Sequence, residues 1–77
     1  MMEATAYRNQ RQDAARYIAG YRAGDPLALM GTYSFEAPSA EATLEVAFRD
    51  FTLSVGDVVE INGQRYAVES FGWRKVS

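Results

Sequence analysis

The residues of this chain that could do chemistry are its carboxylates, because the sequence contains no histidine and no cysteine. Without imidazole or thiolate side chains, structural zinc sites and nucleophilic mechanisms that use a histidine base are excluded. The sequence also holds no Gly-x-x-x-x-Gly-Lys phosphate loop and no Gly-x-Gly-x-x-Gly dinucleotide motif. The chemistry left open is general acid–base catalysis, or hard-cation binding, by paired acids.

Two pairs of acids lie close enough in sequence to be candidates for such work, Asp57 with Glu60 and Glu41 with Glu45. On a strand, Asp57 and Glu60 point to opposite faces, because side chains alternate with a period of two. Glu41 and Glu45 share a face only if Glu41 already lies inside a strand. Exposed charges on the solvent side of a sheet explain both pairs better. We therefore expect no enzyme, no metal, no cofactor and no small-molecule substrate.

The composition describes one small domain spanning residues 1–77. A chain of this length buries only about 60% of its unfolded surface, and no disulfide can stiffen it. We expect a small aromatic-rich core, helped by association with itself or with a partner. No apolar run approaches the roughly 18–20 residues that span a membrane, and the first residues do not form a secretory signal. A cytoplasmic location is expected.

The element that begins this domain is predicted to be a helix over residues 5–23. Thr5 is a permitted N-cap, the interior is rich in Ala, Arg and Gln, and the Gly24-Asp25-Pro26 segment is a stop signal. At 100° per residue, one stripe of this helix combines tyrosines with small apolar residues, and arginines adjoin it. The stripe contains Tyr7, Ala14, Ile18 and Tyr21, and the neighbouring sector contains Arg8, Arg11 and Arg22.

Short strands are expected after the helix. Alternating apolar and polar residues predict strands over 28–36, 42–49 and 51–55, and Gly31 indicates a bulge or a close backbone approach. Asn62-Gly63 between two alternating runs predicts a hairpin with a two-residue type I′ turn. The pattern predicts an α+β domain, in which the N-terminal helix precedes a five-stranded antiparallel meander or small SH3-like barrel over residues 28–71. Residues 72–77 are expected to form a tail.

The net charge of −2 is unevenly distributed along the chain. Residues 1–24 carry four arginines against two acids, whereas residues 25–72 carry eight acids against two arginines. We therefore expect a basic helix beside an acidic sheet, an arrangement that can orient a partner or a neighbouring copy. Solvated charges distributed by chance explain the pattern equally well.

Tyrosine and arginine are enriched at the hot spots of protein interfaces. The predicted helix combines the two, so we expect a protein partner or self-association through Tyr7, Arg8, Arg11, Tyr21 and Arg22, with Trp73 as a further anchor. The alternatives are that the tyrosines pack on the chain's own sheet and that Trp73 closes the core. Nucleic acid is a weaker candidate, because an acidic sheet repels phosphates. Only the helix arginines and the Arg74-Lys75 pair could reach a nucleic-acid backbone.

The segment Leu53-x-Val55-Gly56-Asp57-x-Val59-x-Ile61-x-Gly63-x-x-Tyr66-x-Val68 resembles the hairpin of phage head–tail joining (head-completion) proteins. The resemblance covers about sixteen of the 77 residues. It implies a non-enzymatic ring component of a virion that binds its neighbours and adjacent rings. The same spacing is also found in unrelated SH3-like barrels. A different expectation is a small phage- or mobile-element-encoded inhibitor of a host defence complex, of the anti-CRISPR type, whose acidic sheet occupies a basic groove.

Overall fold

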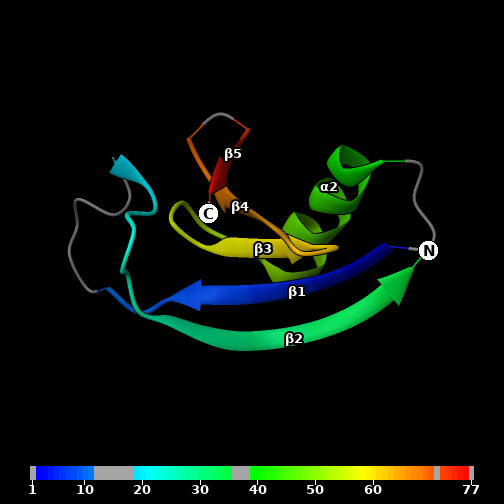
Figure 1. Ribbon diagram of the computed structural model, residues 1–77, viewed down its shortest axis with the longest axis horizontal. Coiled ribbons are helices and arrows are strands. Elements are labelled where there is room, and N and C mark those ends of the chain that lie inside the picture. Colours follow the sequence, from blue (N-terminus) through cyan, green and yellow to red (C-terminus); the bar gives the residue numbers. More distant parts are fainter. Residues whose placement is uncertain (1, 12–18, 36–38, 71, 77) are drawn as a thin grey trace.

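The computed structural model describes residues 2–11, 19–35, 39–70 and 72–76 (Figure 1). These residues form one antiparallel sheet with the strand order β2-β1-β3-β4-β5, together with helix α2. The elements follow the chain as β1 (Met2–Asn9), β2 (Leu27–Phe35), α2 (Ala40–Phe51), β3 (Val58–Ile61), β4 (Gln64–Val68) and β5 (Trp73–Val76). The chain is therefore a small β-rich α+β domain.

The predicted N-terminal helix over residues 5–23 is wrong. Residues 2–9 form β1, which pairs with β2 on one side and with β3 on the other, and residues 12–18 lie outside the described part of the chain. Ala4 and Ala6 are fully buried on one face of β1, and Thr5 between them faces the other way. This period of two is a strand pattern, and pairing with two neighbouring strands outweighs the helix propensity of alanine.

The predicted strands over 42–49 and 51–55 are also wrong, because α2 occupies residues 40–51. Leu44 and Ala47, three positions apart, are both buried, whereas Glu45 between them is exposed. This is the spacing of an amphipathic helix, although the apolar residues of the segment also fit an alternating pattern. The sheet is consequently not a meander in chain order, and β1 lies between β2 and β3.

Local signals at both ends of α2 explain its bounds. The Oγ atom of Ser39 accepts a hydrogen bond from the Ala42 N–H at 3.2 Å, which satisfies one free donor of the first turn. At the other end, Thr52 adopts a left-handed conformation with φ of 54°, and its N–H donates to the Phe48 carbonyl. These two caps fix where the helix starts and stops.

The core lies between α2 and the face of the sheet that carries Ala4 and Ala6. Most of its members are small: Ala4, Ala6, Leu44, Ala47, Leu53, Val59, Ile61 and Val68. Half-buried larger side chains, among them Phe51 and Tyr66, pack around this cluster. Among the described residues no aromatic side chain is fully buried, so the aromatic-rich core expected from the sequence is replaced by a core of alanine and branched aliphatic residues.

The prediction of a hairpin at Asn62-Gly63 is confirmed. These residues join β3 to β4 with φ values of 49° and 86°, both in the left-handed region that a type I′ turn requires. The expected bulge near Gly31 is confirmed as well, because the register of β1 against β2 shifts between Ala6 and Tyr7 and leaves Met30 as the extra residue. A Cβ atom at Gly31 would lie 3.2 Å from the Phe51 ring.

Figure 1 shows β1 and β2 running side by side along the molecule, while β4 and β5 rise steeply away from them. The sheet is therefore strongly twisted, and α2 packs mainly on β1 and β3. Residues 73–76, which were expected to belong to a tail, form β5 at one edge of the sheet. Strand β2 forms the other edge.

Candidate functional site

The structure distributes the six predicted partner-binding residues over several elements. Tyr7 and Arg8 lie on opposite faces of β1, and Trp73 begins β5. Arg11, Tyr21 and Arg22 belong to the connection between β1 and β2. The end of β1 and the β1–β2 connection meet at a set of buried polar side chains. Tyr7 lies elsewhere, on the sheet face opposite α2.

Asp57 is a fully buried carboxylate at the turn before β3. Its two oxygens accept hydrogen bonds from the backbone N–H groups of Asn9 and Ser54, each at 2.9 Å. The Arg8 Nε atom lies 3.5 Å from the Asp57 Oδ2 atom. The carboxylate thus ties the end of β1 to the turn that follows α2.

Asp25 is a second buried carboxylate, with 4% of its side chain exposed. The Asn9 amide and the Arg22 backbone N–H each donate to it at 3.0 Å, and the Arg11 Nε atom lies 3.3 Å away. Burial raises the pKa of Asp25, but the hydrogen bonds from Asn9 and Arg22 and the charges of Arg11 and Arg22 outweigh burial and lower this pKa below its ordinary value. Asp25 is therefore ionised at neutral pH.

Asn9 connects the two carboxylates. It is 2% exposed, and its Nδ2 atom donates both to Asp25 and to the Gly56 carbonyl, each at 3.0 Å. Its Oδ1 atom accepts the backbone N–H of Arg11 at 2.8 Å. We call Asn9, Asp25 and Asp57, with Arg8 and Arg11, the polar cluster.

The polar cluster is built to hold segments together. Its carboxylates accept backbone and amide hydrogens from inside the protein, which leaves them closed to a substrate. Among the described residues, no group of three or more acids is placed to hold a metal ion. Arg8 and Arg11, both predicted to bind a partner, point their charges into this cluster instead of offering them as free cations.

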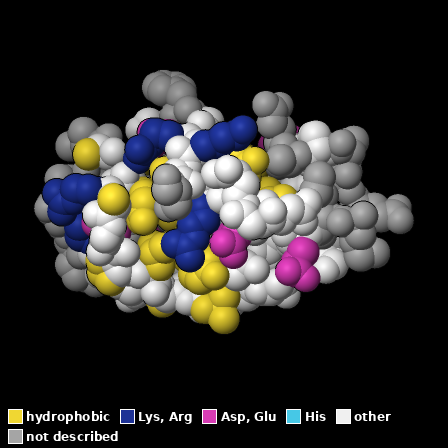
Figure 2. Space-filling model, in the orientation of Figure 1, with side chains coloured by type: hydrophobic (Ala, Val, Ile, Leu, Met, Phe, Trp, Pro, Cys, Tyr) yellow, Lys and Arg dark blue, Asp and Glu magenta, His cyan; other side chains and the backbone are white. Residues whose placement is uncertain are grey.

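The sheet face opposite α2, which we call the open face, carries an exposed leucine at its β2 border. Tyr7 lies across from Leu29 of β2, and Leu29 is 66% exposed. The guanidinium of Arg65 lies over the Tyr7 ring at 5.4 Å from its centroid, and the Arg65 Nε atom is 3.6 Å from Glu60. In Figure 1, β3 lies in front of α2, and Figure 2, in the same orientation, shows hydrophobic side chains gathered beside basic ones.

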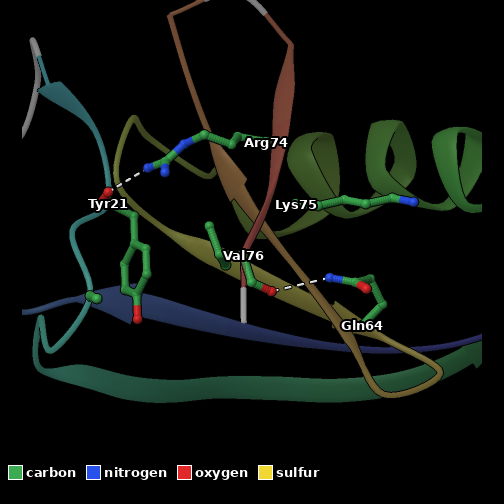
Figure 3. A pocket seen from close by; sticks show the side chains of 6 residues that line it. Tyr21, Gln64, Arg74, Lys75 and Val76 are labelled. Atoms are coloured by element: carbon green, nitrogen blue, oxygen red, sulfur yellow. Dashed lines mark hydrogen bonds between the residues drawn. The ribbon is translucent and has the colours of Figure 1, made fainter.

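A shallow hollow of about 510 Å³ lies between the β1–β2 connection and β5 (Figure 3). Arg74 crosses its upper side and donates to the Tyr21 carbonyl at 2.5 Å. Gln64 donates to the Val76 carbonyl at 3.1 Å, and Lys75 points away from Tyr21. Two of the polar side chains that line the hollow, Arg74 and Gln64, already have partners within the protein, so the hollow is a weaker candidate for ligand binding than the open face is for a protein.

The described arginines are matched by carboxylates. The six ion pairs are Arg8–Asp57, Arg11–Asp25, Arg22–Asp25, Arg49–Asp50, Arg65–Glu60 and Arg74–Glu69. The strands carry four basic residues against two acidic ones, and α2 carries three acids against one arginine. The predicted separation into a basic helix and an acidic sheet is therefore wrong.

Trp73 was predicted either to anchor a partner or to close the core. Its indole packs against the core cluster and meets the Phe48 ring edge-to-face, with centroids 6.1 Å apart. Phe48 is 45% exposed on α2, so this aromatic pair closes the core at its border with solvent.

Leu29 and Arg65 are the surface residues that the sequence reasoning missed. Leu29 was expected to share a face with Tyr33 and Phe35, because all three lie at alternate positions. The extra residue at Met30 changes the alternation, so that Leu29 lies on the open face beside Tyr7. The signal that could have revealed this was Gly31, which marked the bulge.

Comparison with family models, curated proteins and solved structures finds no match to this chain. In the part of the chain that the structure describes, no helix has the length and apolar character needed to cross a membrane. The open face and the polar cluster are consequently the two features from which a function has to be inferred.

Proposed function

We propose that this protein is a non-catalytic interaction module that binds a protein partner through the open face. The observation that supports this most is the exposure of Leu29 across from Tyr7, whose ring lies under the Arg65 guanidinium. A single exposed leucine is ordinary on a protein surface. Leu29 differs because it lies across from Tyr7, whose ring is covered by the Arg65 guanidinium, and tyrosine and arginine are enriched at interface hot spots.

The charge arrangement favours a protein partner over a nucleic acid. Arg65 and Arg74 each lie within 4 Å of a glutamate, Glu60 and Glu69 respectively. A guanidinium already paired with a carboxylate gains less from a phosphate than a free one would, since the existing pair has to be broken first. Among the described residues, the open face therefore lacks the row of free cations that a nucleic-acid backbone needs.

The same pairing argues against the inhibitor alternative. A phosphate mimic needs unpaired carboxylates arranged along a surface, whereas Glu60 and Glu69 have arginine partners and the side chains of Asp25 and Asp57 are buried. Glu3 and Glu45 are exposed, but they lie on different elements, β1 and α2. We therefore propose a virion-assembly role of the head–tail joining type. It is supported by the resemblance of residues 53–68, which span the Asp57 turn and the β3–β4 hairpin.

A test of this function starts from the genes that flank this one, where portal and tail genes are expected. The protein should be co-produced with the portal-type and tail-type proteins encoded there, and the complex purified through the larger protein. We expect the complex to form and Leu29→Ser to weaken it about tenfold or more, because a hot-spot side chain is lost.

The matched control is Phe48→Ser, which removes a large hydrophobic side chain that is exposed on the opposite side of the sheet. This variant should retain the complex, and circular dichroism should show that both variants are folded. Flanking genes unrelated to virion assembly would overturn the virion role. A complex that tolerates Leu29→Ser as well as Phe48→Ser would overturn the open face as its binding surface.

A further inference from the structure

The outer edge of β2 lacks the charges and prolines that normally protect an exposed strand. Its nine residues, Leu-Ala-Leu-Met-Gly-Thr-Tyr-Ser-Phe, include no charged residue and no proline. Strand β1 pairs with one side of β2, and no described strand pairs with the other side. In Figure 1, β2 forms the lower border of the sheet along its full length. Such an edge is a template for pairing with another strand.

Strand β5, at the opposite edge of the same sheet, is protected against pairing with another strand. Strand β5 has four residues, and two of them, Arg74 and Lys75, are exposed and charged. A short, basic edge strand resists pairing with another strand. The two edges therefore differ in length and in charge, and both differences favour association through β2.

The bulge selects the part of β2 that can pair. Met30 interrupts the register against β1, and the Phe51 ring packs close to Gly31. Residues Gly31–Phe35 then continue in regular register against β1. This uninterrupted run of five residues is long enough for a two-stranded antiparallel pairing.

We propose that β2 pairs antiparallel with β2 of a second copy of this chain, which joins the two sheets into one of ten strands. A two-fold axis across Gly31–Phe35 makes the contact self-complementary. A strand without charges meets its own copy without repulsion. The core offers a further reason, because its members are largely alanine and valine and a continuous sheet supplements such a thin core.

This contact is separate from the proposed binding of a partner. Pairing uses the backbone groups of residues 31–35, whereas Leu29 and Tyr7 lie on the other side of the bulge and face outward from the sheet. A dimer would thus present two copies of the open face. The two proposals can fail independently.

The first experiment measures the mass of the full chain by sedimentation and light scattering over a range of concentrations. We expect a dimer of twice the 8.6 kDa chain mass. Thr32→Lys places a charge on the exposed open-face side of β2 and should raise the dimer dissociation constant about tenfold or more. Val76→Lys adds the same charge to β5 and should leave the dissociation constant unchanged.

The second experiment uses the absence of cysteine from the sequence. Cysteines introduced together at Thr32 and Ser34 should give disulfide-linked dimers on mild oxidation, because the two-fold axis places position 32 opposite position 34 of the second copy, and cross-strand neighbours lie about 4.5–5.5 Å apart. Either cysteine alone should link far less, because it lies diagonal to its own copy. Val76→Cys is the control and should remain uncrosslinked.

Three results would overturn the β2 pairing: a monomer at every concentration reached, a dimer that Thr32→Lys leaves intact, or cross-links between position 32 and position 76 when the Thr32→Cys and Val76→Cys chains are mixed. The last would indicate head-to-tail β2–β5 contacts. None of these results bears on whether Leu29→Ser weakens the complex with a virion protein.

Discussion

The polar cluster and the open face use similar residue types in opposite ways. Both place an arginine beside a carboxylate, Arg8 with Asp57 in the cluster and Arg65 with Glu60 on the open face. Asp57 is fully buried and accepts two backbone N–H groups, whereas Glu60 and Arg65 are each about one-third exposed. Burial and backbone partners, and not residue type, decide which charges hold the fold together.

The energetic contrast follows from the same geometry. Removing one partner of a buried pair leaves charges or N–H groups without compensation and costs roughly 3–5 kcal/mol. Exposed ion pairs contribute at most about 1 kcal/mol, because water and salt screen them. Substitutions in the polar cluster should therefore lower the free energy of unfolding strongly, whereas substitutions on the open face should change it little.

The largest effect is expected at Asp57. Asp57→Ala leaves the N–H groups of Asn9 and Ser54 without their acceptor inside the protein, so the free energy of unfolding should fall by about 3 kcal/mol or more. A domain of this size has only roughly 4–12 kcal/mol in total. Urea denaturation followed by circular dichroism measures the change.

The control for this variant is Asp50→Ala on α2. The Asp50 carboxylate lies 3.5 Å from Arg49, but half of its side chain is exposed. Its loss should cost less than about 0.5 kcal/mol. Equal costs at Asp50 and Asp57 would remove the distinction between buried and exposed carboxylates.

A smaller and pH-dependent effect is expected at Asp25. Asp25→Asn keeps the size of the side chain but removes its charge from Arg11 and Arg22 and should cost about 1–3 kcal/mol at pH 7. The lowered pKa of Asp25 means that its contribution is fully present above the unfolded value, about 3.9, and is lost as the pH falls through the folded value.

Unfolding by urea between pH 7 and pH 2.5 measures this dependence. The difference between the natural chain and Asp25→Asn should be largest at neutral pH and should shrink as the solution becomes more acidic than about pH 3.9. A difference that stays constant over this range would show that the charge of Asp25 does not stabilise the fold.

The contrast between the two regions also explains which features could be predicted from the sequence. Asn62-Gly63 identified its hairpin because the type I′ turn depends on the conformations of those two residues alone. Gly31 indicated the bulge for a similarly local reason. Such signals need no knowledge of distant parts of the chain.

The wrong predictions involve elements that depend on distant partners. Strand β1 is stabilised by β2 and by β3, which follows some fifty residues later, while its own alanines favour a helix. In α2, the apolar positions 44, 46 and 48 fit a period of two, although Leu44 and Ala47 face the core.

The polar cluster was missed for the same reason. The Asn9 N–H and Asp57 are 48 positions apart, and nothing in the sequence near Asp57 marks it as the acceptor. The adjoining Gly56 does not identify that distant partner either. Asp25 likewise read as part of a helix stop signal, whereas its carboxylate reaches back to Asn9 at the end of β1.

The smallest effect is expected on the open face, at Arg65. Arg65→Gln removes the charge above the Tyr7 ring and the ion pair with Glu60, both at a site exposed to solvent, so stability should change by less than about 1 kcal/mol. The same variant should weaken the complex with a virion protein, because a guanidinium over an aromatic ring is part of the proposed contact. Thermal unfolding and the co-purification assay therefore have to be run on one preparation. If Arg65→Gln destabilised the fold as strongly as Asp25→Asn, the Arg65 side chain would be stabilising the sheet. That result would contradict the proposal that Tyr7 and Arg65 form a binding surface.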